Sequence, residues 1–356
     1  MSDRILLGTR KGLFAVERRG ERRWEIGDAR FLGSPVNLTL TDLRDGAVYA
    51  ALDHGHFGAK LQRSRDGGQS FEEIAMPCFA EAEEASVKAI WSLSAGSGAQ
   101  PGRLYAGTIP GALFISDDHG DSWSLVRSLW DHPTREKWFG GGTDLPALHS
   151  ILVDPRDDRH LWIALSCAGV WETRDGGESW ENIGEGLRAE YMPPEMTESP
   201  LVQDPHMLVS CRAAPDSLWM QHHNGVFRSS DGGRRWQECT RVDPSAFGFA
   251  IAVDPDDPRV AWTVPGVKDE CRVAVDAALC VSRTLDGGEG WQALREGLPQ
   301  RHAYDIVFRH ALDVSADGRR LAFGTSTGSV YVSEDRGESW MAVGEHLPQV
   351  YSVAFG

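Results

Sequence analysis

Short apolar segments, separated by glycine-containing turns, recur along the whole chain and predict an all-β protein. One pair is formed by residues 104–108 and 111–115, which flank a Pro-Gly turn. Apolar runs of this length between turn residues are typical of β-strands. We expect seven inner strands, which begin near Val36, Val87, Leu148, His206, Phe249, Tyr304 and Val350.

A polar motif of the form Ser/Thr-x-Asp-x-Gly-x-x-Trp/Phe follows most of these segments. Its six copies occupy residues 64–71, 116–123, 173–180, 229–236, 284–291 and 333–340. Self-similarity at a period of about 50 residues indicates a propeller or a solenoid. The Asp carboxylate is suited to accept backbone N–H groups and close a turn, and the glycine adopts backbone angles that a side chain disfavours. We expect the aromatic residue to fill the gap between neighbouring sheets.

Seven inner strands with six motifs leave one blade without a clean motif, and we expect that blade to be split between the chain ends. Residues 350–355 then form its inner strand and residues 6–16 the next two, with Gly20 and Trp24 where a degenerate motif belongs. This closure leaves no exposed edge strand. The predicted fold is a seven-bladed β-propeller that forms a single domain over residues 1–356.

Composition excludes several classes of partner. No run of 18 apolar residues is present, and we expect neither a membrane span nor a signal peptide. The formal net charge of −16 disfavours binding to nucleic acid or to an anionic membrane. The six cysteines show no CxxC pairing, which favours reduced thiols and a cytoplasmic protein.

The six motifs resemble those of the Asp-box, or BNR-repeat, superfamily of β-propellers, which includes sialidases, other glycosidases, sortilin-type receptors and a photosystem assembly factor. The resemblance covers nearly the whole chain and implies that the Asp boxes lie opposite the functional face. It suggests glycosidase-like hydrolysis or protein binding. The Arg-Ile-Pro signature of sialidases is absent, and the corresponding neighbourhood reads Ser34-Pro35-Val36-Asn37. Sialidase-type rings also have six blades, so we do not expect a true sialidase.

Polar residues gather where inner strands begin and second strands end, which is one end of a propeller. We predict a binding site for a small polar or anionic molecule there. Its candidate ligand-binding residues are Arg10, Lys11, Asp53, Lys88, Trp138, His222, Asn224, Asp305 and Tyr351. Trp138 belongs to a long connection, residues 129–144, that we expect to cover this end and to stack on a ligand.

Histidines at the same positions suggest a second interpretation, a site for a divalent transition metal. The candidate ligands are His54, His56, His149, His206 and His223. Neutral imidazole is a common ligand of such metals. If His54 and His56 lie on a strand they share one face, whereas adjacent His222 and His223 point oppositely. A metal-free pocket and a merely solvated channel remain alternatives.

Catalysis would require an acid–base pair, and the candidates are His149 or His206 together with Asp204. Arg272, from an insertion near residue 270, is a further catalytic candidate. Three functions remain open. The first is binding of a small ligand, with glycosidase-like hydrolysis as a further step. The second is a metal-dependent enzyme. The third is a non-catalytic scaffold or assembly factor that binds a protein partner.

Overall fold

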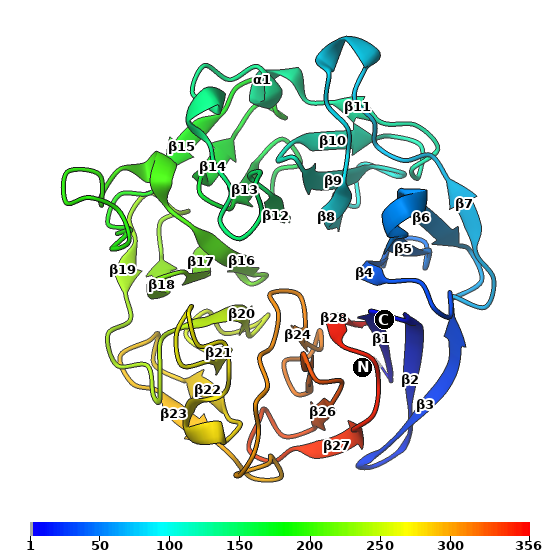
Figure 1. The fold of residues 1–356 in the computed structure, drawn as a ribbon, viewed down its shortest axis with the longest axis vertical. Helices are drawn as coiled ribbons and strands as arrows, with labels where there is room; N and C mark the ends of the chain where they lie inside the picture. Colours follow the sequence, from blue (N-terminus) through cyan, green and yellow to red (C-terminus); the bar gives the residue numbers. More distant parts are fainter. Residues whose placement is uncertain (1–2) are drawn as a thin grey trace. The chain divides into compact units, whose positions relative to one another are not determined.

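The computed structural model describes residues 3–356 and consists of seven antiparallel four-stranded sheets (Figure 1). This confirms the predicted seven-bladed β-propeller. The chain forms two compact units, one of residues 37–208 and one of residues 209–356 with the N-terminal segment up to Val36. The chain passes from one unit to the other twice, after the first residue of β4 (Val36–Thr41) and within β16 (Pro205–Cys211).

The first three blades follow one another along the chain. The first blade contains β4 (Val36–Thr41), β5 (Val48–Asp53), β6 (Ala59–Ser64) and β7 (Glu72–Ile74). The second contains β8 (Ala89–Ala95), β9 (Leu104–Ile109), β10 (Leu113–Ser116) and β11 (Ser124–Leu125). The third contains β12 (Leu148–Val153), β13 (Leu161–Leu165), β14 (Gly169–Thr173) and β15 (Glu181–Ile183).

Three further blades have the same strand order. The fourth contains β16 (Pro205–Cys211), β17 (Ala214–His222), β18 (Gly225–Ser229) and β19 (Gln237–Glu238). The fifth contains β20 (Gly248–Val253), β21 (Ala261–Pro265), β22 (Val281–Thr284) and β23 (Gln292–Leu294). The sixth contains β24 (Leu312–Val314), β25 (Leu321–Gly324), β26 (Val330–Ser333) and β27 (Met341–Gly344).

The seventh blade joins the two ends of the chain. Its order is β28 (Val350–Phe355), β1 (Arg4–Thr9), β2 (Gly12–Gly20) and β3 (Arg23–Arg30), and Figure 1 shows both termini at this sheet. Trp24 is 8% exposed, and its indole donates a hydrogen bond to Glu334 Oε1 at 2.9 Å. The predicted split blade is confirmed, with Trp24 packed where a box tryptophan would be.

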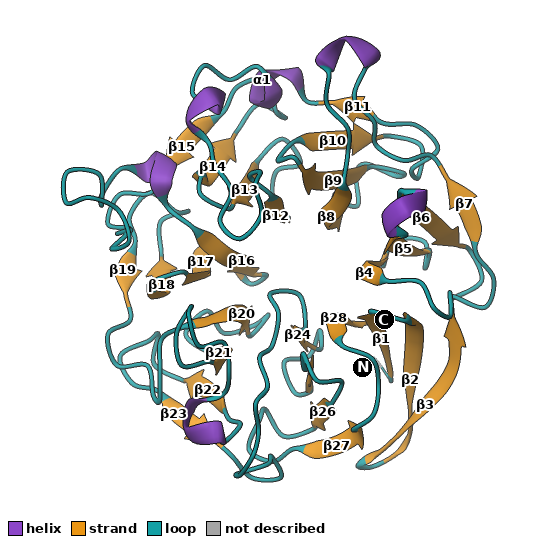
Figure 2. Ribbon diagram, in the orientation of Figure 1, coloured by secondary structure: helices purple, strands orange, loops and turns teal. Residues whose placement is uncertain are grey.

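Helices are short and confined to connections (Figure 2). They are η1 (Gly55–Phe57), η2 (Glu81–Glu83), α1 (Arg127–Trp130), η3 (Arg135–Lys137), η4 (Pro200–Val202) and η5 (Val275–Ala277). None of the described helices is long and apolar enough to cross a membrane. All six cysteines are free thiols; Cys78 and Cys271 are exposed, and the other four are buried.

The connections of a blade alternate between two ends because its strands pair in sequence order. We call "box end" the end with the Asp box between the third and fourth strands. We call "loop end" the opposite end, which carries the turn between the second and third strands and the connections between blades. At the third box, the Asp175 carboxylate accepts the backbone N–H of Ser179 at 2.9 Å and the hydroxyl of Thr173 at 2.7 Å. The boxes therefore act as turn closures, as their sequence predicts.

The sixth blade departs from the predicted strand positions. Its inner strand is β24 (Leu312–Val314), not a strand beginning near Tyr304. Residues 303–308 form an irregular segment, in which Ile306 exchanges hydrogen bonds with Ser326 and packs on Phe247 and Phe249. Residues 303–308 are therefore apolar because they form a buried connection, and they do not form a strand.

Candidate metal centre

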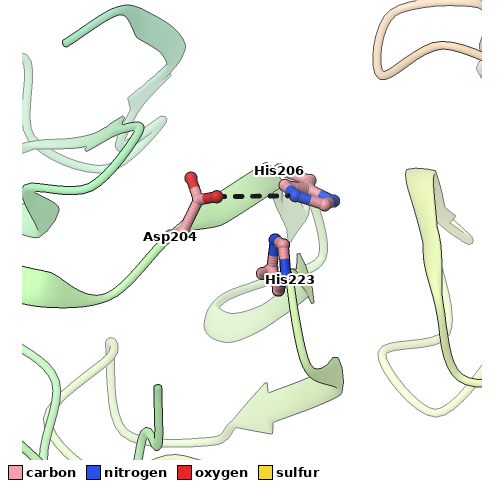
Figure 3. Close-up of side chains that lie close together, drawn as sticks. All are labelled: Asp204, His206 and His223. Carbon is pink, nitrogen blue, oxygen red and sulfur yellow. Dashed lines mark ion pairs between the residues drawn. The ribbon is translucent and has the colours of Figure 1, made fainter. Parts of the chain in front are cut away.

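Three side chains of types that can ligate a metal ion lie close together at the loop end of the fourth blade. Asp204 immediately precedes β16, His206 is the second residue of that strand, and His223 lies in the turn between β17 and β18. These strands belong to one sheet. One carboxylate oxygen and one nitrogen from each imidazole lie within 4.8 Å of one another (Figure 3). The structure thus contains a group of two histidines and one aspartate with the donor atoms of a metal site.

Local sequence explains why Asp204 and His206 face each other. Residues two apart in an extended segment point to the same side. Pro205 between them begins the strand, a position where its missing N–H is tolerated. Figure 3 shows both side chains beside the turn that carries His223.

The spacing within the group suits a shared ion better than a direct hydrogen bond. Asp204 Oδ2 and His206 Nε2 lie 3.7 Å apart, and both side chains are 4% exposed. Hydrogen bonds between nitrogen and oxygen span about 2.7–3.2 Å. Two ligands of one tetrahedral ion, each about 2.1 Å from it, lie roughly 3.4 Å apart. A small contraction would therefore allow both atoms to bind one ion.

A second layer of groups surrounds the Asp204 carboxylate. Burial raises the pKa of Cys167, and so do the charge of Asp204 and the hydrogen bond between the two side chains. Burial, followed by the charges of Asp204 and Cys167, also raises the pKa of Tyr191. The thiol and the phenol are therefore neutral at physiological pH. Such outer groups orient the ligands of metal sites.

The connection between the second and third blades passes directly over Asp204. A Cβ at Gly141 would lie 2.8 Å from Cys167 Sγ and 2.9 Å from both carboxylate oxygens of Asp204. Only glycine fits this approach without displacing a neighbour. Cys167 and Gly141 escaped the sequence analysis. Cys167 lies in the turn between the second and third strands of its blade. Such turns lie at the loop end, so this position could have indicated that Cys167 is near the site.

The other histidines predicted as metal ligands lie elsewhere. Among residues 3–356, the group of three excludes His54, His56 and His149. The segment with His54 and His56 forms the 3₁₀ turn η1, so the expected strand alternation is wrong there. His149 is fully buried, and its Nδ1 lies 3.0 Å from Ser150 Oγ. Its predicted catalytic role stays a prediction, as does the acid–base role of Asp204 and His206.

Adjacent His222 and His223 have different surroundings. His222 is fully buried with its ring 5.3 Å from that of Phe227, and its Nδ1 accepts the backbone N–H of Asn224 at 3.1 Å. His223 is partly exposed and joins the group of three. His222 and Asn224 thus shape the turn that presents His223.

The remaining predicted ligand-binding residues occupy separate loop ends. Arg10, Lys11 and Lys88 are exposed. The Asp53 carboxylate accepts the Gly55 N–H at 2.9 Å.

In the sixth and seventh blades, Asp305 accepts a hydrogen bond from Thr327, and the Tyr351 ring lies 6.1 Å from that of Phe308. In the fifth blade, Arg272 pairs with Asp269 at 2.5 Å. Their roles in binding or catalysis stay predictions.

Trp138 is largely buried. It is 7% exposed and belongs to the core of the third blade, with its ring 5.2 Å from that of Trp171. Its packing fixes the connection to this core, and its stacking on a ligand stays a prediction. The neighbouring Phe139 is 38% exposed.

Comparisons with known proteins agree with this architecture. The family model described as BNR/Asp-box repeat matches residues 114–125. A search of curated proteins finds no significant match. Among solved structures, an ancestral GH74 enzyme is similar with a TM-score of 0.58 and 18% identity, covering 83% of this chain and 36% of its own. This chain thus spans about a third of that enzyme.

Two further solved structures lack a stated enzymatic activity. YCF48 bound to D1 peptide is similar with a TM-score of 0.53 and 15% identity, covering 86% of this chain and 83% of its own. The Cps50 (Swd1) β-propeller domain from Myceliophteria thermophila has a TM-score of 0.54 and 11% identity, covering 90% and 86%. At these identities the likeness concerns the fold alone. The repeat match, the seven sheets and this likeness together support a β-propeller that contains BNR/Asp-box repeats.

Proposed function

We propose that this propeller binds a divalent transition-metal ion through Asp204, His206 and His223. The observation that supports the proposal is the approach of their three ligand atoms to within 4.8 Å at one end of one blade. Two imidazoles and one carboxylate form a donor set typical of zinc and non-haem iron sites that keep open positions.

The ion would serve to bind and polarise a small oxygen-containing ligand. One carboxylate and two neutral imidazoles leave a divalent ion with a net positive charge, so an anionic ligand is favoured. The Gly141 connection and buried Cys167 lie against the Asp204 carboxylate and would cover the ion on that side. This proposal unites the predicted small-ligand site with the predicted metal site; hydrolysis of the ligand would be a further step.

A second candidate function is protein binding. Several large apolar side chains are exposed at loop ends: Leu32 is 75% exposed, Phe57 78% and Tyr304 59%. The structure of YCF48 with a peptide shows that a propeller of similar fold can bind one.

The proposed metal site is tested by titrating metal-free protein with Co²⁺ and Zn²⁺. Co²⁺ reports its ligands through visible absorption, and Zn²⁺ binding follows from competition. The wild type is expected to bind about one ion per chain. His206→Ala and His223→Ala should each weaken binding at least 100-fold, because each removes one of three protein ligands.

Exposed His56 supplies the matched control, since it is a loop-end histidine outside the group. His56→Ala should bind Co²⁺ like the wild type. Failure of the wild type to bind either ion would refute the proposal. Equal loss in all three variants would show that the ion binds through several scattered histidines instead.

A further inference from the structure

An arginine stands directly before the Ser or Thr of the Asp box in three blades, as Arg63, Arg228 and Arg283. Each of them lies in the third strand of its blade, and its guanidinium reaches the Asp box of the next blade. There Nη1 donates a hydrogen bond to the backbone carbonyl of His119, Gly287 and Arg336, respectively, at 2.9, 3.2 and 3.1 Å. The three arginines therefore make the same backbone contact between neighbouring blades.

Two of these arginines also contact a carboxylate at the sixth position of that next box. Arg63 Nη1 lies 2.9 Å from Asp121 Oδ1, and Arg283 Nη2 lies 2.6 Å from Glu338 Oε1. Both arginine side chains are 5% exposed. Within the described chain Arg283 Nε has no hydrogen-bond partner, so its charge is balanced through Nη2. Charge-assisted contacts of this kind join the guanidinium of one blade to the box of the next.

Arg228 lacks this carboxylate. Glu289 holds the sixth position of the fifth box, but it is exposed, and among residues 3–356 no acidic side chain pairs with Arg228. The cross-strand neighbour of Arg228 is the neutral Gln237. That of Arg63 is Glu72, whose carboxylate accepts the Arg63 Nε–H at 2.9 Å. Arg228 Nε is buried and has no hydrogen-bond partner in the described residues. Of the three arginines, Arg228 is the one that no carboxylate contacts.

A cavity lies between the fourth blade and the fifth Asp box, beside this arginine. It is lined by Arg228, by residues 237–241 and by residues 287–289 of the box, and its volume is about 70 Å³. A water needs roughly 15 Å³ and a drug-sized ligand about 300–1,000 Å³. The cavity therefore has room for a small ion or a few waters, and it is too small for a larger organic ligand.

The charges around the cavity favour an anion next to Arg228. Arg241 is a second cation in the lining and is exposed. Burial raises the pKa of the Cys239 thiol to about 12, so this buried part of the lining is neutral. Glu238 and Glu289 also line the cavity, but both are exposed, and neither accepts a hydrogen bond from Arg228 among the described residues. Exposed carboxylates compete only weakly with an anion held at a buried N–H group.

We propose that Arg228 and Arg241 bind a small inorganic oxyanion, phosphate or sulfate, in this cavity. The ion takes the place that the carboxylates of Asp121 and Glu338 hold beside the other two arginines, and it links the fourth blade to the fifth. A guanidinium presents paired N–H groups that match two oxygens of such an ion. The site is separate from the proposed metal centre, since the two share no residue.

The test titrates metal-free protein with sulfate and with phosphate at constant ionic strength. The Arg228 Nε–H signal is followed in ¹H–¹⁵N spectra, where its loss in Arg228→Lys assigns it, and calorimetry gives the affinities. The signal should shift to saturation with at least one ion, and the ion that binds more tightly is the ligand. Arg228→Gln should weaken binding at least tenfold, because it removes charge-assisted hydrogen bonds.

Two further variants grade the effect. Arg228→Lys keeps the charge but not the paired N–H groups, so its affinity should lie between those of the wild type and Arg228→Gln. Glu289→Gln should strengthen binding about twofold to fivefold, because it removes an exposed negative charge from the lining. Melting temperatures show which variants are folded, and Arg228→Lys carries the comparison where Arg228→Gln is not.

Arg283→Gln is the matched control. Arg283 holds the same position in the fifth blade, but its guanidinium contacts Glu338. The variant should bind sulfate and phosphate like the wild type. The proposal is overturned if neither ion shifts the Arg228 signal, or if the Arg228 variants bind both ions as tightly as the wild type. Equal weakening in Arg283→Gln would also overturn it, because the ions would then respond to the overall charge of the protein.

Discussion

Asp175 at a box end and Asp204 at a loop end are held in different ways. Asp175 accepts the Ser179 N–H at 2.9 Å and the Ser179 hydroxyl at 2.5 Å, and these bonds lower its pKa to about 2. Asp204 is buried, and its carboxylate lies 3.7 Å from His206 Nε2, beyond hydrogen-bond length. The box aspartate completes a turn within its own motif, whereas the loop-end aspartate lies beside donors from other segments. This difference agrees with a structural role for Asp175 and with the metal-binding role that we propose for Asp204.

Replacing each aspartate by alanine should separate these roles most clearly. Asp175→Ala should lower the free energy of unfolding by about 1–2 kcal/mol, because it removes charge-assisted hydrogen bonds. It should leave Co²⁺ affinity unchanged. Asp204→Ala should weaken Co²⁺ binding at least 100-fold, because it removes one of the three proposed protein ligands, and it should cost less stability than Asp175→Ala, because Asp204 closes no Asp-box turn. Urea denaturation and Co²⁺ titration measure the two effects.

Equal destabilisation by the two substitutions would contradict the comparison. Asp204 would then be a structural residue like those of the boxes. The melting temperature with added metal gives a further check. An ion that binds only the folded state must raise the melting temperature.

Asp313 provides a third kind of carboxylate. It accepts the backbone N–H groups of Val314 and Phe355, each at 2.8 Å, but burial outweighs these bonds and raises its pKa to about 6. The folded state therefore holds this proton more tightly than the unfolded chain does. Its contribution to stability is full below about pH 4 and is lost as the pH rises through 6, amounting to at most about 3 kcal/mol.

Melting temperatures measured between pH 5 and 7 test this sign. The wild type should become less stable across the interval, and Asp313→Asn should remove most of that slope whatever its absolute stability. The pKa of Asp175 is lowered, so its contribution to the stability of the folded state changes with pH in the opposite direction. That contribution is lost as the pH falls below 3.8. If the pH dependence of the melting temperature persists in Asp313→Asn, titratable groups other than Asp313 cause it.

The smallest expected effect concerns the connection over Asp204. The added methyl group of Gly141→Ala would collide with the Cys167 sulfur and the Asp204 carboxylate. Co²⁺ affinity should fall about tenfold, within the range of outer-layer changes at metal sites. Gly98→Ala is the control, because a Cβ there meets nothing within 4 Å. Unchanged affinity in Gly141→Ala would mean that the connection yields without moving Asp204.

The repeat made most of the fold predictable. Each Asp box contains the groups that close its own turn, so the motif fixed the blade corners and the split blade. The inner strand of the sixth blade was missed because burial, not strand pairing, makes residues 303–308 apolar. A hydrophobic pattern indicates burial, and it does not distinguish a buried strand from a buried connection.

The candidate site was predicted only as a set of residue types at one end of the blades. Strand direction placed Asp204, His206 and His223 there together with other polar residues. The conformation of the turns decides which histidines lie close together. The alternation of side chains along a strand does not predict the 3₁₀ turn at His54 and His56. Trp138 lies in a connection, and its burial depends on Trp171, which lies in the later strand β14.

The proposed metal centre is tested most directly by crystallising the protein with Zn²⁺ and recording anomalous diffraction at the zinc edge. The account predicts one peak about 2.0–2.2 Å from an Asp204 oxygen and from one nitrogen each of His206 and His223. Anomalous density at other histidines, with none between these three side chains, would contradict it.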